Sequence, residues 1–378
     1  MDVKQIASML NTQVIPEVLG ESVTVTEDLS NIVDVGTALA NANAMDPFSK
    51  KLVNVIGRMV FVDRIYRGST PKVLMDSWTW GSVMAKISVD LPDVEVNESW
   101  ELQNGTSYDP NIFYGSAVTE KFFNKRVTAE IPRSFTELQL RQSFHSAEQF
   151  NGFIAMLYTS VENKLTICID QLVMRTINGA MAEAINASHR IDLLAKYNTV
   201  KGTSLTPAAA IINEDFLKFC TYQIALYAKR MERMSVNFNV GGKERFTPAD
   251  KRHVVLLADF SEAIGPYTLA GAYNRDDIKV PEFDSVPFWQ GNDQGSYDLD
   301  EVSTINVLLP SNNATTVNQA YIVGCIFDRD ALGVTNLDRR VTTAYNAKAE
   351  FYNNYFKFEL GSFADTNEQM LVFAIAGS

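Results

Sequence analysis

The residue types that most often carry catalysis or bind metals are few and scattered in this chain. The histidines His145, His189 and His253 are neither paired nor spaced as metal ligands, and the cysteines form no CxxC pair. A zinc site and a disulfide framework are therefore not predicted, and a reducing compartment fits best. There is no GxGxxG or GxSxG segment, and VGGKER around Gly241 lacks the spacing of a phosphate-binding loop. We expect no catalytic, cofactor-binding or metal-binding residue. The three cysteines are Cys168, Cys220 and Cys325.

Several carboxylates could do chemistry, but each has a simpler interpretation. Asp259 follows an apolar run, where enzymes with parallel sheets often place a catalytic carboxylate. The turn that opens the next helix explains it better. Asp328 and Asp330 could hold a cation only weakly, because FDRDALG lacks the pattern of a calcium-binding loop. Solvated turns explain this run and the similar run of Asp298, Asp300 and Glu301.

Positive charge is concentrated in one region after residue 228. The pattern favours a surface that forms salt bridges within the subunit, with contact to an acidic partner as the alternative. The cluster comprises Lys229, Arg230, Arg233, Lys243, Arg245, Lys251 and Arg252.

An acidic run lies between Ile87 and Glu120. It holds seven Asp or Glu and no Lys or Arg. Four aromatic residues in it are of types enriched at protein interfaces, so we predict a subunit interface here, with folding back onto the same domain as the alternative. These residues are Trp100, Tyr108, Phe113 and Tyr114.

The elements that would position this run are a pair of strands. Alternation predicts one strand from Val73 to about Asp90 and a matching strand over Phe122–Ile131, so the acidic run is the far end of a long hairpin. A two-stranded ribbon is marginal alone in water and needs a partner surface.

The rest of the chain predicts helices followed by strands. Asp46-Pro47 opens a helix within an irregular arm that carries short helices. A capping box of Ser146 with Gln149 precedes an apolar stripe that predicts one very long helix, up to about Asn178. Another helix is predicted from Glu214 to Met234. We expect HVVLLA, INVLLP and AYIVGCIF to be strands of one sheet. We also expect a helix that Ser261 caps, and two strands, YFKFELG and MLVFAIA, near the end of the chain.

Composition excludes several classes of protein. A net charge of -12 argues against a nucleic-acid reader, although not against a protein that encloses nucleic acid. No apolar run approaches the roughly 18 residues of a membrane span, and the first residues do not resemble a secretion signal. With 378 residues and 46% hydrophobic residues, the chain can build a substantial core.

The order of these parts resembles the tailed-bacteriophage major capsid protein of the Hong Kong (Johnson) fold, most closely in small short-tailed phages of Gram-positive hosts. The resemblance covers nearly the whole chain and is carried by three segments. They are IVDVGTALANANAMDPFSKKLVNVIGRM, the hairpin with the long helix through FIAMLYTSVENKL, and IFDRDALGVTNLDRRVTTAYNAKAEFYNNYFKFELGSFADTNEQMLVFAIA.

The resemblance implies an α+β fold in four parts. Residues 1–70 would be an N-terminal arm, and 71–135 an extended hairpin loop that lies along the neighbouring subunit. Residues 136–205 and 340–362 would form a peripheral domain with the long spine helix. Residues 206–339 and 363–378 would form an axial domain with a central sheet.

The resemblance also implies a function. The chain would assemble with itself, as hexamers and pentamers, into an icosahedral virion capsid around double-stranded DNA. Scaffolding and portal proteins would be its further partners, assembly would occur in the bacterial host cytoplasm, and no membrane, cofactor or catalysis would be involved. An encapsulin-like compartment shell is the alternative within the fold, disfavoured by the helical arm. A carboxylate-based hydrolase is the alternative from another class.

Some capsids of this fold join subunits by an isopeptide bond between a Lys of the extended loop and an Asn of a neighbour. The outer loop here contains no Lys, and the nearest, Lys86 and Lys121, lie at its base. Asn353 and Asn354 would therefore have no attacking amine within reach. We expect noncovalent shells held by contacts of the hairpin and the arm.

Overall fold

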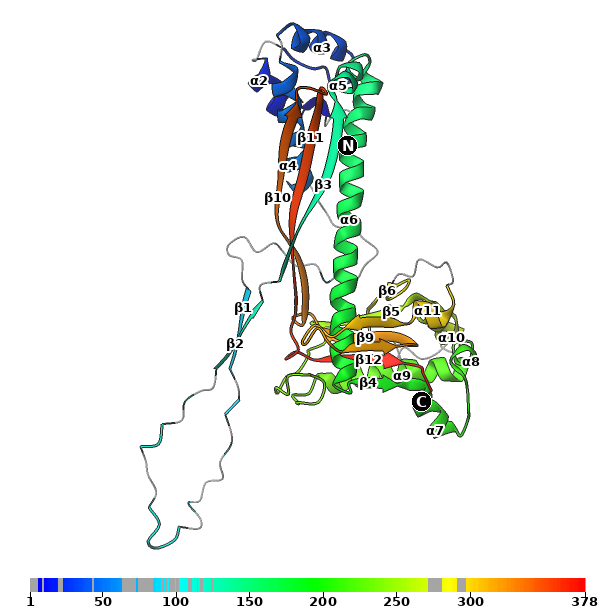
Figure 1. Ribbon diagram of the computed structural model, residues 1–378. Coiled ribbons are helices and arrows are strands. Elements are labelled where there is room, and N and C mark those ends of the chain that lie inside the picture. The colour runs from blue at the N-terminus through cyan, green and yellow to red at the C-terminus, as the bar shows by residue number, and fades with distance from the viewer. Residues whose placement is uncertain are drawn as a thin grey trace.

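A computed structural model gives the architecture of the chain. It describes residues 6–8, 10–19, 23–42, 44–62, 73, 84–89, 91–92, 94, 99, 102–107, 111–113, 115, 118–123, 125–270, 281–290 and 297–377. The molecule is elongated: one long helix joins a helical cap and a three-stranded sheet at one end to a five-stranded sheet at the other, and a hairpin extends away from the side (Figure 1). None of the helices in this part of the chain is long and apolar enough to cross a membrane.

The long helix α6 (Ala147–Asn186) has 40 residues and ends eight residues beyond the predicted Asn178. At 1.5 Å per residue it is about 60 Å long. Ser146 caps it, because its Oγ accepts a hydrogen bond of 3.2 Å from the backbone N–H of Gln149, which is one of the two hydrogen bonds of the predicted capping box. The apolar stripe is buried along most of the helix, including Leu165, Val173 and Ile177.

The three-stranded sheet is antiparallel, in the order β10 (Leu332–Asn346), β11 (Phe351–Ala364) and β3 (Arg126–Thr136). Every second side chain of β11 from Tyr352 to Leu360 is buried, which is the alternation of the predicted returning strand. The prediction for Phe122–Ile131 was wrong. Ile131 lies in β3 and pairs with Phe356, because a strand with one apolar face fits this sheet as well as it fits a hairpin.

Helix α5 (Glu137–Ser143) follows β3 directly. It begins with a reciprocal capping box between Thr136 and Gln139, a signal that the sequence analysis did not use.

The five-stranded sheet has the order β4 (Arg190–Asp192), β12 (Met370–Ala374), β9 (Ile322–Asp328), β5 (Arg252–Leu257) and β6 (Phe283–Val286). Strands β5, β9 and β12 are almost entirely buried, as expected of continuous apolar runs. Around the sheet lie α7 (Leu193–Lys201), α8 (Pro207–Ala210), α9 (Glu214–Met231), α10 (Ala258–Ala270) and α11 (Leu299–Val302) (Figure 1).

Three details near this sheet differ from the sequence prediction. The run from Ile305 forms β7 (Ile305–Leu308), which pairs with β8 (Thr316–Gln319) in a separate two-stranded sheet, because its alternating burial suits a half-exposed hairpin. Helix α10 begins at Ala258, so Ser261 lies inside it and donates to the Ala258 carbonyl. Strand β4 pairs with β12, although it lies in the segment 136–205 that was assigned to the other domain.

The N-terminal arm contains short helices, as the sequence predicted, and its apolar side chains are buried within the subunit. Its elements are η1 (Leu10–Val14), α2 (Ile15–Val18), α3 (Ile32–Asn41) and α4 (Met45–Val62). They lie near the N-terminal end of α6, and α4 runs along β10 (Figure 1). Leu10, Leu39 and Phe48 are fully buried. The Phe48 ring packs against Phe144 with centroids 5.5 Å apart. The apolar side chains of these short helices are buried against one another and against the neighbouring α5 and β10, so the arm is part of the core of the subunit.

Candidate assembly site: the hairpin and its root

The hairpin is an antiparallel ribbon of β1 (Met84–Val89) and β2 (Val118–Phe123). Cross-strand partners lie on the same face of a ribbon, so the register divides its residues into two faces. Lys86 with Lys121 and Ser88 with Thr119 lie on the half-buried inward face. The outward face is exposed and comprises the pairs Ala85–Phe122, Ile87–Glu120 and Val89–Val118.

The outward face is largely apolar. Ile87 is 65% exposed, Phe122 61%, Val118 59% and Val89 55%. Large apolar residues towards the tip, Val94, Leu102, Ile112 and Phe113, are exposed as well. A contiguous exposed apolar stripe on a monomer is typical of a protein interface.

Of the four predicted interface residues, the structure describes Phe113, which is 92% exposed. The described part of the subunit therefore leaves this ring uncovered. Trp100, Tyr108 and Tyr114 lie outside the described residues.

The inward face is held by charge at its root. Lys86 Nζ lies 2.9 Å from Asp365 Oδ2 and 2.6 Å from Glu368 Oε1. Lys121 Nζ lies 3.0 Å from Asp365 Oδ1 and donates to the Thr366 hydroxyl at 2.9 Å. One carboxylate thus bridges both strands of the hairpin, and only 2% of the Asp365 side chain is exposed. Sequence reasoning missed this cluster, which we call the root lock (Lys86, Lys121, Asp365, Glu368).

The protonation states of Asp365 and Lys86 stabilise the root lock. Burial works against the charge of Asp365, but hydrogen bonds from Lys86 and from the Asn367 N–H outweigh it and lower the pKa of the carboxyl. Burial likewise works against the charge of Lys86, but Glu368 and Asp365 outweigh it and raise the pKa of the amine. Both groups are therefore charged at neutral pH.

The turn that carries Asp365 is itself fixed. The Asp365 N–H donates to the Ala331 carbonyl at 2.7 Å, and Gln369 Nε2 donates to the Arg245 carbonyl at 2.9 Å. Beside the lock, the Phe123 ring lies 5.3 Å from that of Phe363. The root of the hairpin thus contacts the C-terminal end of β11, and the turn after β11 is hydrogen-bonded to the loop before β5.

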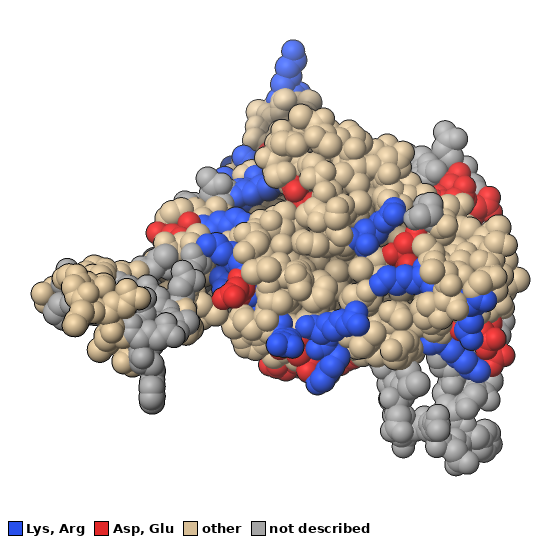
Figure 2. Space-filling model, turned by 90° about the horizontal axis from the view of Figure 1, so that it is seen from below, with Lys and Arg blue, Asp and Glu red and all other residues tan. Residues whose placement is uncertain are grey.

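The basic cluster mainly serves the subunit itself, as predicted. Lys251 pairs with Asp330 at 2.6 Å, and Arg252 pairs with Glu232 at 3.3 Å. Arg245 lies 3.8 Å from Glu368, beside the root lock. At this end of the molecule, basic and acidic side chains lie close together in several places on a mostly uncharged surface (Figure 2).

The candidate chemistry residues have structural roles, but the solvated turn predicted for Asp328 is wrong, because Asp328 ends strand β9 and is buried. Asp259 lies in the first turn of α10, and His253 Nε2 lies 2.9 Å from Asp284 within the five-stranded sheet. Burial raises the pKa of Asp328 and of the Cys220 and Cys325 thiols. In the portion of the chain that the structure describes, no three His, Cys, Asp or Glu side chains converge as metal ligands.

Comparison with known protein families identifies the family of this chain. The family model of the Phi29-like phage major capsid protein matches residues 12–374. The chain belongs to this family. It is a major capsid protein that forms the shell of a phage head, and its place is the virion capsid. The capsid protein therefore assembles with other copies of itself.

One solved structure with a TM-score above 0.5 supports the fold. The capsid structure of Staphylococcus phage Andhra is similar over 83% of this chain and 87% of that chain, with 10% identity and a TM-score of 0.51. A capsid chain of cyanophage P-SCSP1u matches over 84% of this chain and 92% of that one, with 14% identity and a TM-score of 0.45. No curated protein sequence matches the chain. The predicted α+β capsid fold is confirmed.

Proposed function

We propose that the β1–β2 hairpin is the element by which each capsid subunit holds its neighbour. The outward stripe of Ile87, Val89, Val118 and Phe122 carries this proposal, because it is exposed while the other face of the same ribbon is fixed to its own subunit. Covering such a stripe contributes roughly 25 cal/mol per Å² of apolar area. The acidic tip with Trp100, Tyr108, Phe113 and Tyr114 extends the contact surface.

The test compares two substitutions of similarly exposed residues. Phe122→Ser removes an apolar group from the outward face, whereas Leu138→Ser, at a residue that is 63% exposed on α5, removes one elsewhere. We expect both variants to fold and only Phe122→Ser to shift assembly to higher protein concentration, measured by light scattering and electron microscopy. Equal assembly of the two variants would refute the proposal.

The family assignment also suggests the form of the shell, its partners and its source. We infer an icosahedral shell of hexamers and pentamers that encloses double-stranded DNA without sequence-specific binding. Scaffolding and portal proteins would be partners, assembly would take place in the host cytoplasm, and the subunit would have no enzymatic activity. A short-tailed phage of a Gram-positive host is the source that the sequence resemblance favours.

We also propose the four-part division into arm, extended loop, peripheral domain and axial domain. The strand pairing supports moving three boundaries. β3 (Arg126–Thr136) groups with the peripheral sheet through β11. β4 and α7, at 190–201, group with the axial sheet through β12. β10 begins at Leu332, before the predicted boundary at 340.

A further inference from the structure

The dipeptide Asn-Gly occurs three times in the chain, at 104–105, 151–152 and 178–179. In this dipeptide an asparagine side chain reacts readily with its own backbone, because glycine has no Cβ to shield its N–H and leaves the backbone free to rotate. The reaction then depends on how firmly the structure holds each pair. The three pairs lie in three different environments, so they can be compared within one protein.

Asn104 and Gly105 lie in a turn of the outer hairpin, which extends away from the body of the subunit (Figure 1). All residues from 102 to 107 are exposed. A backbone hydrogen bond of 3.3 Å, from the Thr106 N–H to the Gln103 carbonyl, spans the turn. Gly105 has a φ of +92°, and no atom lies within 4 Å of the position that a Cβ would take. The Asn104 side chain and the Gly105 nitrogen can therefore approach each other without displacing packed atoms.

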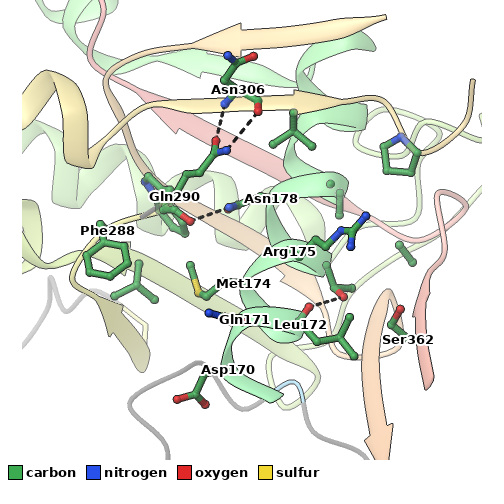
Figure 3. A pocket seen from close by; sticks show the side chains of 18 of the residues that line it. Asp170, Gln171, Leu172, Met174, Arg175, Asn178, Phe288, Gln290, Asn306 and Ser362 are labelled. Atoms are coloured by element: carbon green, nitrogen blue, oxygen red, sulfur yellow. Dashed lines mark hydrogen bonds between the residues drawn. The ribbon is translucent and has the colours of Figure 1, made fainter. Parts of the chain in front are cut away.

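The other two pairs lie inside α6. A helix engages the N–H of each interior residue with the carbonyl four residues earlier, so the glycine nitrogen is not free to attack. Asn151 is half-buried, in the second turn of the helix. Asn178 is only 5% exposed, and its Nδ2 donates to the Trp289 carbonyl at 2.6 Å (Figure 3). The helix thus protects both pairs, and burial protects Asn178 further.

We propose that Asn104 is a site of spontaneous deamidation in the folded subunit, whereas Asn151 and Asn178 are protected. The Gly105 nitrogen loses its proton to solvent base and forms a bond to Cγ of Asn104. The bond from Cγ to the side-chain nitrogen breaks, and this nitrogen takes a proton from water and leaves as ammonia. Water then opens the five-membered succinimide ring at either carbonyl and gives aspartate or isoaspartate. Water is the co-reactant, and nothing is oxidised or reduced.

The product makes the outer hairpin more acidic. The run between Ile87 and Glu120 already holds seven Asp or Glu and no Lys or Arg, and each conversion adds one carboxylate. In the isoaspartate product the main chain passes through Cβ, so the turn also becomes longer by one atom. Deamidation therefore produces subunits whose hairpins differ in charge and shape, and the like charges of the run repel one another more strongly.

Peptide mapping of full-length free subunits tests the site directly. Free subunits are used because the proposed hairpin contact would cover the tip in a shell. The protein is held at mildly alkaline pH, and mass spectrometry follows the conversion of amide to acid at each Asn-Gly pair. We expect Asn104 to convert several-fold faster than Asn151 and Asn178. Equal rates at the three pairs, or an Asn104 that stays intact, would overturn the proposal.

The same measurement in urea tests whether the structure causes the difference. Unfolding removes the helix and the burial that protect 151–152 and 178–179, so the three rates should become similar. A difference that persists unchanged in urea would show that the flanking sequence sets the rates, and would overturn the structural basis of the proposal.

A matched pair of substitutions provides a second readout. Asn104→Ser removes the reactive amide and keeps a residue type that suits turns, whereas Asn151→Ser removes the amide of a protected pair. On isoelectric focusing, wild-type subunits should develop a more acidic form with time. We expect Asn104→Ser to abolish this form and Asn151→Ser to leave it unchanged. An acidic form that develops equally fast in Asn104→Ser would contradict the assignment.

Discussion

The N-terminal helices and the β1–β2 hairpin both extend from the body of the subunit, yet their apolar side chains have opposite surroundings. In the arm, Leu10, Leu39 and Phe48 are fully buried. In the hairpin, Ile87 and Phe122 are more than half exposed. The helices can cover one another's apolar stripes, whereas a two-stranded ribbon has two faces and its subunit covers only one of them. The arm therefore stabilises the subunit, and the hairpin is free to join subunits.

The largest effect is expected from removing the outer hairpin. We would replace residues 90–117 by Asn-Gly, a turn that suits the ladder ending at Val89 and Val118. Because the root lock and both sheets remain, the variant should stay folded and soluble but build no closed shells, as judged by circular dichroism, sedimentation and electron microscopy. Normal shells would show that the tip does not join subunits, and failure to fold would show that it packs on its own domain.

A pair of Phe substitutions sharpens the contrast between the arm and the hairpin. Phe48→Ala should lower the free energy of unfolding by about 3–5 kcal/mol, because it empties a fully buried site. Phe113→Ala should change it by less than about 0.5 kcal/mol, because that ring is 92% exposed, yet it should weaken assembly. Urea unfolding of free subunits measures both, and similar losses from the two would contradict the comparison.

The root lock should have an intermediate effect. Asp365→Asn leaves Lys86 and Lys121 facing each other without their shared carboxylate. The lysines are partly exposed and screened, so the expected loss of unfolding free energy is about 2 kcal/mol, below that of a fully buried pair. A loss close to zero in urea unfolding would show that the lock is not a stabilising contact.

The contribution of the lock should depend on pH in a defined way. The pKa of Asp365 is lowered, so its contribution is complete above the ordinary value of 3.8 and is lost as the pH falls through the lowered pKa. The pKa of Lys86 is raised, so its contribution is complete below 10.5 and is lost as the pH rises through the raised pKa. The stability difference between wild type and Asp365→Asn should be constant between these limits and shrink outside them.

The last prediction is that no covalent bond links the subunits, so boiling in detergent should separate the particles into single chains. Lys86 and Lys121 are held by Asp365, the Asn353 amide oxygen accepts a hydrogen bond from Ser134, and Asn354 is fully buried. No isopeptide bond should form, so a denaturing gel of boiled particles should give one band near 42.1 kDa. A ladder of multimers that persists under reducing conditions would contradict this.

Elements with a long, uniform pattern could be predicted from the sequence. The stripe from Phe150 predicts α6, and the alternation of Phe356, Phe358 and Leu360 predicts β11. The alternation of apolar and polar residues could not show which neighbouring strand a given strand pairs with. Val127, Ala129 and Ile131 fit the ribbon and the three-stranded sheet equally well, and the sequence pattern does not show that β2 ends at Phe123 and β3 begins at Arg126.

The assembly site could be predicted only in part. The excess of acid and aromatic residues indicated the hairpin, and Phe113 is exposed in the subunit; its place at an interface stays a prediction. The root lock was missed because Lys86 and Asp365 are separated by most of the chain, so no local spacing connects them. The burial of the arm was missed because each of its helices is short, and their mutual packing cannot be read from one helix at a time.

A reconstruction of wild-type shells by electron cryomicroscopy tests the central contrast most directly. The account predicts that density for β1 and β2 lies against a neighbouring subunit, while α3 and α4 pack on the α6 of their own chain. A hairpin folded onto its own subunit, or an arm exchanged onto a neighbour, would contradict it.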